Sequence, residues 1–338
     1  MSYEIKKCRL SKSSHLISVL DLGNQYLTGI FPSSKNEPIS KGPLELVWCE
    51  DSKLLQLKHS FPLDQMYGDN YGYRSGLNQS MVNHLTQKVK LLENKVLFNS
   101  KDIVIDIGSN DATTLKAYNR KDIIKVGIDP TGKKFKKYYN DDMILISDFF
   151  PTEKFQLKFP NKKAKIITSI AMIYDLENPL NFFQSIAEIL DENGIWHFEQ
   201  SYLPSMLETN AYDTICHEHL EYYTLGNIKY MLEQANLKII DVQINDINGG
   251  SFAVTAAHMH SNIFSENKAT IDSILAKEQE MGLSTLNPFR EFERRVFEHR
   301  NNLRKLVSSL VSDGKKVFGY GASTKGNVIL QFCGFSSK

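Results

Sequence analysis

Ile103-Val-Ile-Asp-Ile-Gly-Ser-Asn-Asp111 is the stretch of sequence that decides the fold. β-Favouring residues lead into Asp106, and a single glycine, Gly108, and small polar residues follow before a helical pattern begins at Thr113. This order predicts a buried parallel strand that ends in a tight turn at the N-terminus of a helix. Ligands of open α/β sheets bind at such turns.

The turn is unsuited to a dinucleotide or to a nucleoside triphosphate. It has one glycine instead of the three in Gly-x-Gly-x-x-Gly, and it lacks the Lys-Ser/Thr pair of a P-loop. Asp106 would repel a phosphate but suits a cation, and S-adenosylmethionine carries an ammonium and a sulfonium group. The next expected strand ends in Asp129, which is placed to accept hydrogen bonds from ribose hydroxyls. The alternative is an ordinary doubly wound domain with polar strand ends.

A third acid strengthens the prediction of an S-adenosylmethionine site. Asp148 follows the expected strand at 143–147, where its carboxylate can accept from the adenine amino group while Phe149 covers the ring. Asp148 alone could equally be a helix N-cap or a turn residue. Three acids at successive strand ends are harder to dismiss. The predicted cofactor-binding residues are Asp106, Gly108, Asn110, Asp111, Asp129, Asp148 and Phe149.

The composition is that of an ordinary globular protein. The chain has 338 residues, of which 41% are hydrophobic and 23% charged, and its net charge is +1. No apolar run is long enough to span a membrane, the N-terminus lacks the apolar core of a signal peptide, and the four cysteines lie far apart. We therefore expect a cytoplasmic monomer or homodimer that binds neither nucleic acid nor membrane and has no disulfide framework.

Strand and helix patterns alternate over the middle of the chain, which predicts a doubly wound, Rossmann-like α/β sheet. The expected strands are 102–107, 124–129, 143–147, 164–170, 194–200 and 237–244, with another at 251–256. The expected helices lie near 77–97, 111–119, 131–139, 178–190 and 226–236. We expect three domains: a small β-rich N-terminal lobe (1–70), a cofactor-binding domain (71–245) and a second α/β lobe (246–338).

The last 75 residues predict a charged surface helix or hairpin at 264–311 and then a strand, a glycine turn and a helix. The turn contains Gly321, Lys325 and Asn327 and suits a phosphate or pyrophosphate. The alternative is a tight strand–helix turn with a solvated lysine. Because one strand and one helix cannot bury a sheet of their own, we expect this lobe to be truncated.

Two short segments in the N-terminal lobe look like zinc knuckles that have lost ligands. Cys8-Arg-Leu-Ser11 and Cys49-Glu-Asp-Ser52 each carry serine where a second cysteine would stand. A structural zinc site normally needs four Cys or His ligands, and neutral serine binds zinc poorly. His59 could supply one more ligand. We expect a degenerate zinc-binding lobe without metal.

His217-Glu218-His219 is the strongest candidate for acid–base chemistry. The two histidines would share one face of an extended segment and could bind a metal, but no other His or Cys pair is near in the sequence. The other interpretation is a histidine of near-neutral pKa oriented by a carboxylate. The expected position of the block, just past the C-terminal end of a strand, favours catalysis.

Taken together, these segments resemble the S-adenosylmethionine-dependent C-methyltransferases that act on nucleotide-linked 4-keto-deoxyhexoses. The resemblance covers the whole chain and rests on the knuckle positions, Gly108–Asp111, His217–His219, Asn248–Ser251 and Gly319–Asn327. It implies a zinc-knuckle lobe, a methyltransferase core and a Rossmann-like C-terminal lobe that helps to hold the nucleotide sugar. The two serines in the knuckles and the short C-terminal lobe depart from the family pattern.

The resemblance also implies roles for individual residues. His219 would be the base, with Glu218 beside the sugar, and His217 is its competitor. Tyr71 or Tyr73 would line the same pocket. The residues expected to bind the substrate are Tyr71, Asn248, Gly321, Lys325 and Asn327. Tyr73 is expected among the catalytic residues, with His217, Glu218 and His219. The expected reaction is C-methylation through an enolate; the alternatives are O-methylation of a sugar or polyketide hydroxyl, or a decayed protein that binds the cofactor without turnover.

Overall fold

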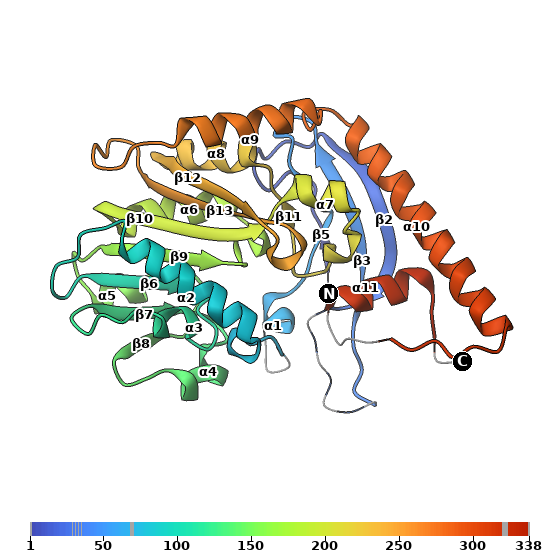
Figure 1. The fold of residues 1–338 in the computed structure, drawn as a ribbon, viewed down its shortest axis with the longest axis horizontal. Helices are drawn as coiled ribbons and strands as arrows, with labels where there is room; N and C mark the ends of the chain where they lie inside the picture. The colour runs from blue at the N-terminus through green and yellow to red at the C-terminus, as the bar shows by residue number, and fades with distance from the viewer. Residues whose placement is uncertain are drawn as a thin grey trace.

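The computed structural model describes residues 2–28, 30, 32, 34, 36–67, 71–319 and 324–336. Figure 1 shows a large mixed sheet on one side of the molecule and a smaller sheet, with the long strands β2 and β3, on the other. The two sheets are built mainly from different parts of the chain, and one short strand crosses from the larger domain to the smaller sheet.

The large sheet has seven strands in the order β12-β13-β10-β9-β6-β7-β8. Their bounds are β6 Ile103–Ile107, β7 Ile124–Ile128, β8 Met143–Ile146, β9 Ala164–Ile170, β10 Leu190–Ser201, β12 Leu237–Asn245 and β13 Ser251–His258. The pairs from β10 to β8 are parallel, whereas β13 is antiparallel to both of its neighbours.

The strand order reverses between β6 and β9. From β6 the chain moves outward to β7 and β8, and it then returns to β9 and β10 on the other side of β6. The carboxyl ends of β6 and β9 therefore meet at a topological switch point, which is where open α/β sheets bind ligands. The predicted doubly wound fold is confirmed.

Helices cover both faces of this sheet because its buried strands present apolar residues on alternate sides. One face packs against α2 (Gln79–Glu93) and α3 (Thr113–Lys116). The other packs against α6 (Pro179–Ile189), α8 (Leu225–Gln234) and α9 (Lys268–Glu280). The remaining short helices are α1 Leu63–Met66, α4 Gly132–Phe135, α5 Lys154–Lys158 and α7 Leu203–Thr209.

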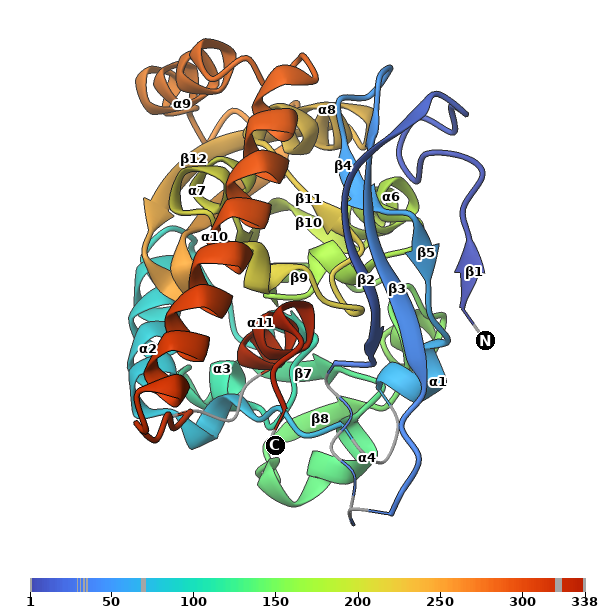
Figure 2. The same ribbon diagram turned by 90° about the vertical axis from the view of Figure 1, so that its right-hand side faces the viewer.

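The smaller sheet has the order β11-β4-β3-β2. It comprises β2 (Leu16–Tyr26), β3 (Lys41–Cys49), β4 (Leu55–Leu57) and β11 (Glu221–Tyr222), and beside it β1 (Tyr3–Glu4) pairs with β5 (His59–Ser60). Figure 2 shows the long helix α10 (Asn287–Ser312) and α11 (Thr324–Cys333) on this side of the molecule, where both contact β2. Their apolar residues and those of β2 and β3 form a second core.

The C-terminal part of the chain differs from the expectation in two ways. β13 pairs with both β10 and β12, so the sheet of the middle domain continues past the expected boundary at residue 245. The expected strand before the glycine turn does not form: residues 315–319 have no strand partner among the described residues, and Phe318 is exposed. In the described part after β13 the regular elements are the helices α9, α10 and α11. An isolated strand there would leave its backbone groups unpaired.

Phe183 in α6 tests how far the core depends on the contact between α6 and the sheet. It is fully buried, with its ring centroid 4.7 Å from that of Trp196 in β10. We expect Phe183→Ala to lower the free energy of unfolding by about 3–5 kcal/mol, because it removes apolar contacts and leaves a cavity. Phe318→Ala, at an exposed phenylalanine, is the control and should change it little in the same denaturant titration. Equal effects would contradict this packing.

Candidate functional site

A cavity of about 280 Å³ opens at the carboxyl ends of the central parallel strands, at the switch point. Its lining brings together residues that lie far apart in the sequence. Among the predicted site residues it includes Tyr71, Tyr73, Gly108, Asn110, Asp129, Phe149 and Asn248. The cavity is therefore the centre of the candidate site.

Three residues with positive φ shape the turn after β6: Gly108, Asn110 and Ala112. Gly108 has φ +74°, and a Cβ there would lie 3.1 Å from Cγ of Met172, so glycine serves both the backbone conformation and the close approach. Asn110 has φ 49° and donates its backbone N–H to Oδ2 of Asp129 at 2.7 Å. The end of β7 thus holds the turn after β6 in place.

Asp129 combines this structural role with a place in the cavity lining. Its Oδ1 accepts from the backbone N–H and the hydroxyl of Thr131, at 2.6 and 2.5 Å. Burial raises the pKa of Asp129, and these hydrogen bonds oppose the increase. A carboxylate oxygen can accept two hydrogen bonds. Oδ1 already accepts two, but Oδ2 accepts one, from Asn110, so Oδ2 is still able to receive a ligand hydroxyl.

Asp106 does not line the cavity, contrary to the expectation of direct cofactor contact. Its side chain is buried within the sheet and accepts from the Thr168 hydroxyl of β9 at 2.5 Å. Burial raises the pKa of Asp106 to about 7. Thr168 on the neighbouring strand β9 offers a hydroxyl in the interior of the sheet. For this reason the Asp106 carboxylate is bound there and does not reach the cavity.

Asp111 and Asp148 are likewise occupied by local contacts. Asp111 accepts from the backbone N–H of Gly76 and lies 3.5 Å from Arg74, so it fixes the loop before α2. Asp148 contacts Lys154 at 2.8 Å, and the hydrogen bond from this lysine holds the pKa of Asp148 below its usual value. Neither carboxylate lines the cavity. Asp148 accepts hydrogen bonds from Phe149 and Thr152, as a turn residue does.

Two cavity residues were missed by the sequence analysis. The Tyr67 hydroxyl donates to Oδ2 of Asp175 at 2.6 Å, which joins the aromatic loop to the segment after β9. Oδ1 of Asp175 is buried and has no hydrogen-bond partner among the described residues. Burial raises the pKa of Asp175 well above its usual value. The available signal was an acid shortly after the strand at 164–170.

Glu199 in β10 is a third missed residue. It lines the cavity and accepts from His84 at 2.6 Å and Asn245 at 2.9 Å, with Lys88 at 3.0 Å. Burial opposes ionisation, but the hydrogen bond from His84 and the charge of Lys88 lower the pKa of Glu199 to about 2. His84 and Lys88 are four residues apart on α2, a spacing that places both on one helix face.

The His217-Glu218-His219 block forms a β-turn, closed by the N–H of His219 and the carbonyl of Cys216 at 3.1 Å. The two histidines therefore do not share a face, as an extended segment would require. His217 is buried: its Nδ1 accepts from the backbone N–H of Thr28 and its Nε2 donates to the carbonyl of Gly42. Both ring nitrogens are used to hold the smaller sheet, which favours a structural role for His217 over the predicted catalytic one.

His219 is arranged differently. A carbonyl oxygen can only accept, so the 2.8 Å contact with Thr214 places the proton on Nδ1. Nε2 then carries a lone pair, and it has no hydrogen-bond partner within the described part of the chain. Burial lowers the pKa of His219 to about 4, which keeps the ring neutral near pH 7. The geometry is that of an oriented general base.

His219 faces a second, much smaller cavity that adjoins the first. Tyr174 and Ser201 line the smaller one, while the adjacent residues Asp175 and Gln200 line the larger. Glu218, half-buried beside His219, accepts from the Thr28 hydroxyl at 2.8 Å. The expectation that His219 and Tyr71 line one pocket is therefore corrected to two adjoining cavities.

The predicted substrate residues near the C-terminus are only partly brought together. The Lys325 ammonium donates to the carbonyl of Asn248 at 2.6 Å, which places α11 against the cavity rim. Asn327 is exposed on α11. Gly321 lies outside the described residues. Tyr73 lines the cavity but is half exposed.

The four degenerate knuckle positions do converge, as their spacing suggests. Cys8 Sγ lies 3.2 Å from the Ser52 hydroxyl, and Cys49 Sγ lies 3.4 Å from the Ser11 hydroxyl. Hydrogen bonds between thiols and hydroxyls thus join positions at which a structural site would have four thiolates around a metal. Within the described residues no group of three or more His, Cys, Asp or Glu side chains could hold a metal ion.

Comparisons with known proteins agree with this domain order. Family models match a putative zinc binding domain over residues 8–67, a methyltransferase domain over 80–242 and a C-methyltransferase C-terminal domain over 246–338. C-methyltransferase NovU from Streptomyces niveus is 28% identical over 337 residues, which make up 98% of this chain and 79% of that protein.

Solved structures match more weakly. The complex between the Haloferax volcanii Trm112 methyltransferase activator and the putative methyltransferase gives a TM-score of 0.45 at 16% identity, over 55% of this chain and 95% of that chain. An S-adenosylmethionine-dependent methyltransferase from Clostridium acetobutylicum gives 0.40 at 14% identity, over 51% and 89%. Among the described residues, no helix has the length and apolar character needed to cross a membrane.

The knuckle geometry predicts how zinc content responds to substitution. We expect the unaltered chain to contain no stoichiometric zinc by elemental analysis, because two serines replace thiolates. Ser11→Cys combined with Ser52→Cys should gain one zinc per chain, since each hydroxyl already lies next to a cysteine sulfur. Ser14→Cys with Ser52→Cys has the same number of thiols and should not. Zinc in the unaltered chain, or none in the first variant, would contradict this interpretation.

Proposed function

We propose that this chain, which belongs to the S-adenosylmethionine-dependent C-methyltransferases, methylates the carbon next to the ketone of a nucleotide-linked 4-keto sugar. The observation that carries the proposal is the juxtaposition at the switch point. The glycine turn and Asp129 share a cavity with an aromatic loop, and an oriented neutral histidine faces the adjoining cavity. A methyl donor and a carbon acid with its base need this arrangement.

The residues of the cavity suit S-adenosylmethionine, which supplies a methyl group on a positively charged sulfur. Asp129 would accept from the ribose hydroxyls, and Phe149 would cover the adenine. Gly108 permits the close approach of backbone and ligand. The carboxylates of Asp129 and Glu199 in the lining match a cationic ligand better than a phosphate. Asp106 would act indirectly, by fixing the end of β6.

Cofactor binding can be tested at Asp129 without any knowledge of the acceptor. We expect Asp129→Asn to weaken the binding of adenosylhomocysteine roughly 10-fold or more in calorimetry, because it removes charge-assisted hydrogen bonds. Asp148→Asn is the matched control and should change the affinity less, because Asp148 does not line the cavity. The assignment fails if the two variants weaken binding equally, or if the chain binds NAD and not adenosylhomocysteine.

In the proposed reaction His219 removes the proton from the carbon next to the ketone. The electron pair of that C–H bond moves into the enolate, and the proton stays on Nε2 until solvent takes it. Nδ1–H remains on the Thr214 carbonyl, which supports the positive charge that the ring acquires. Glu218 lies close enough to the cavity for its charge to act on Tyr71. Burial is the main cause that raises the pKa of Tyr71, and the negative charges of nearby carboxylates, that of Glu218 among them, raise it further. We assign Glu218 to a sugar hydroxyl.

The nucleotide part of the substrate would lie at the rim where α11 meets the large sheet. Lys325 and Asn248 are in contact there, and the lysine ammonium is a suitable partner for a diphosphate. Asn327 would extend this contact, with Tyr71 and Tyr73 against the sugar. Placing the acceptor carbon and the methyl group about 3–3.5 Å apart would supply much of the acceleration.

His219 is the residue whose replacement tests the mechanism. With a nucleotide-linked 4-keto-deoxyhexose as acceptor, His219→Asn should lower turnover about 10²–10⁴-fold and leave adenosylhomocysteine affinity unchanged. His217→Asn should lower the melting temperature, and it should lower turnover less than His219→Asn does. Because the low pKa keeps His219 neutral, the turnover of the unaltered chain should stay level from pH 8 down to about 5 and fall only near pH 4.

The same assay separates methylation at carbon from methylation at oxygen. Enolate formation exchanges the acceptor C–H with solvent deuterium, and His219→Asn should abolish that exchange. Methyl transfer without exchange would indicate O-methylation. Near-normal turnover of His219→Asn together with an inactive His217→Asn would overturn the assignment of the base.

A further inference from the structure

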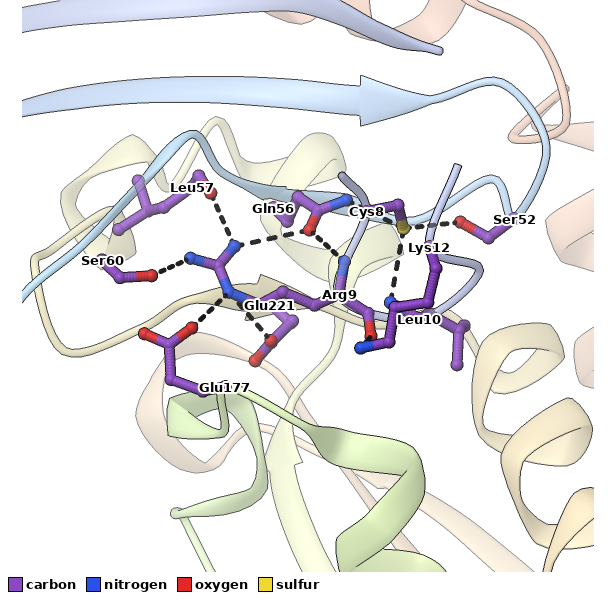
Figure 3. A network of polar contacts seen from close by, with 10 residues as sticks. All are labelled: Cys8, Arg9, Leu10, Lys12, Ser52, Gln56, Leu57, Ser60, Glu177 and Glu221. Carbon is purple, nitrogen blue, oxygen red and sulfur yellow. Dashed lines mark hydrogen bonds and ion pairs between the residues drawn. The ribbon is translucent and has the colours of Figure 1, made fainter. Parts of the chain in front are cut away.

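Arg9 is a buried cation at the junction between the degenerate knuckle and the larger domain (Figure 3). Its Nη1 donates to the Leu57 carbonyl at 2.7 Å and its Nη2 donates to the Ser60 hydroxyl at 2.7 Å. Its Nε faces away from these anchors, toward Glu177 at 3.4 Å and Glu221 at 3.6 Å. One planar group of the small lobe thus contacts two carboxylates of the larger domain.

Each of the two carboxylates belongs to a functional part of the site. Glu177 lines the large cavity. Glu221 lies two residues after His219, lines the same small cavity as that histidine, and pairs in β11 with Gln56 of β4. Arg9 therefore contacts one residue in the lining of each cavity.

Glu221 has an unusual environment. Its side chain is fully buried, and neither carboxylate oxygen has a hydrogen-bond partner within the described residues. Burial raises the pKa of Glu221 well above its usual value, and the Arg9 guanidinium limits that increase. The other charged or titratable groups that act on it include Glu177, Asp175 and Cys8, and Arg9 is the cation among them. Glu221 in turn raises the pKa of the buried Tyr222 and Tyr223, which stay neutral. An ionised Glu221 would therefore depend on Arg9.

The knuckle holds Arg9 in position without a metal. The backbone N–H of Arg9 donates to Oε1 of Gln56 at 3.0 Å, and Nε2 of the same glutamine donates to Cys8 Sγ at 3.1 Å. The Ser52 hydroxyl contacts that sulfur at 3.2 Å, and Lys12 donates to the Arg9 carbonyl at 2.7 Å. Arg9 is thus fixed on its backbone side by the knuckle and on its side-chain side by the two strands β4 and β5.

We propose that Arg9 is a positioning residue for methyl transfer, which neutralises Glu221 and so holds the segment that carries His219 against the active-site cavity. This inference rests on the proposed role of His219. In it, the knuckle keeps a catalytic function after losing its zinc ligands, because it presents Arg9 to the larger domain. Loss of the guanidinium would leave a carboxylate buried and unpaired, which is strongly unfavourable.

The first test needs no acceptor. Arg9→Met should lower the melting temperature, and the gap to the unaltered chain should widen as the pH rises through the pKa of the Arg9-paired Glu221, which already lies well above its usual value. The sign follows from Glu221: without Arg9 its pKa in the folded chain rises further above the unfolded value, so stability is present at low pH and is lost as pH rises. Arg9→Met with Glu221→Gln, which cannot ionise, should remove the pH dependence of the gap. A gap that is independent of pH and is not reduced by Glu221→Gln would overturn the proposal.

The second test measures turnover at pH 7. We expect Arg9→Met to lower kcat about 10–100-fold, with adenosylhomocysteine affinity within about twofold of normal, and Glu221→Gln to restore most of the loss in the double variant. Arg9→Lys keeps the charge but loses the fork of donors and should lie between. Normal kcat in Arg9→Met, or a loss of cofactor affinity as large as that of kcat, would contradict a positioning role.

The two tests separate this inference from the proposed function. If His219 is not the base, the pH-dependent stability gap and its removal by Glu221→Gln still appear, but kcat does not follow them. If Arg9→Met does not fold, Arg9→Lys and the double variant carry the same comparison. A double variant as unstable as Arg9→Met alone would show that Arg9 acts by packing and not by charge.

Discussion

The pairing of β11 with β4 is the constraint on which the rest of this structure depends. β11 has only two residues, Glu221 and Tyr222, yet it takes a segment of the larger domain into the sheet of the small lobe. On one side of it His217 contacts Thr28 and Gly42, and on its own strand Glu221 contacts Arg9. His219 lies between these anchors. As the proposed base, His219 would have to meet a substrate within a few tenths of an ångström, and it would gain from being held at both ends.

The cavity is organised by the same principle of contacts from several segments. The turn after β6 is held by Asp129 of the next strand, and the aromatic loop is held by the bond from Tyr67 to Asp175. Both interactions are made by residues of the chain itself and connect segments that are far apart in the sequence. In the proposal, hydrogen bonds to Cys8 and the contacts of Arg9 position the knuckle lobe against the larger domain.

Much of the fold could be predicted because its signals are local. The core strands are short apolar runs bounded by acids or glycine, and β6, β7, β8 and β9 lie within one or two residues of their expected bounds. The convergence of Cys8, Ser11, Cys49 and Ser52 also followed from spacing alone. The strand expected near 315–319 had the right pattern, but it has no neighbouring strand with which to pair.

The direction of individual side chains was harder to predict, because it depends on residues far away in the sequence. Asp106 lies beneath the turn because Thr168 of another strand offers a hydroxyl there. His217 and His219 diverge because a β-turn replaces the extended segment that was expected. Arg9 and Glu221, separated by more than two hundred residues, give no common signal in a single sequence. The structure therefore adds most to the sequence prediction at the contacts between domains.

The central claim is that this site transfers a methyl group to carbon. The most direct measurement uses S-adenosylmethionine carrying a carbon-13 methyl group, with a nucleotide-linked 4-keto-deoxyhexose as acceptor, and reads the product by NMR. This account predicts a labelled methyl group whose carbon-13 shift and couplings place it on the ring carbon next to the ketone. A labelled methyl group on oxygen, or an acceptor that stays unlabelled while the cofactor binds, would contradict it.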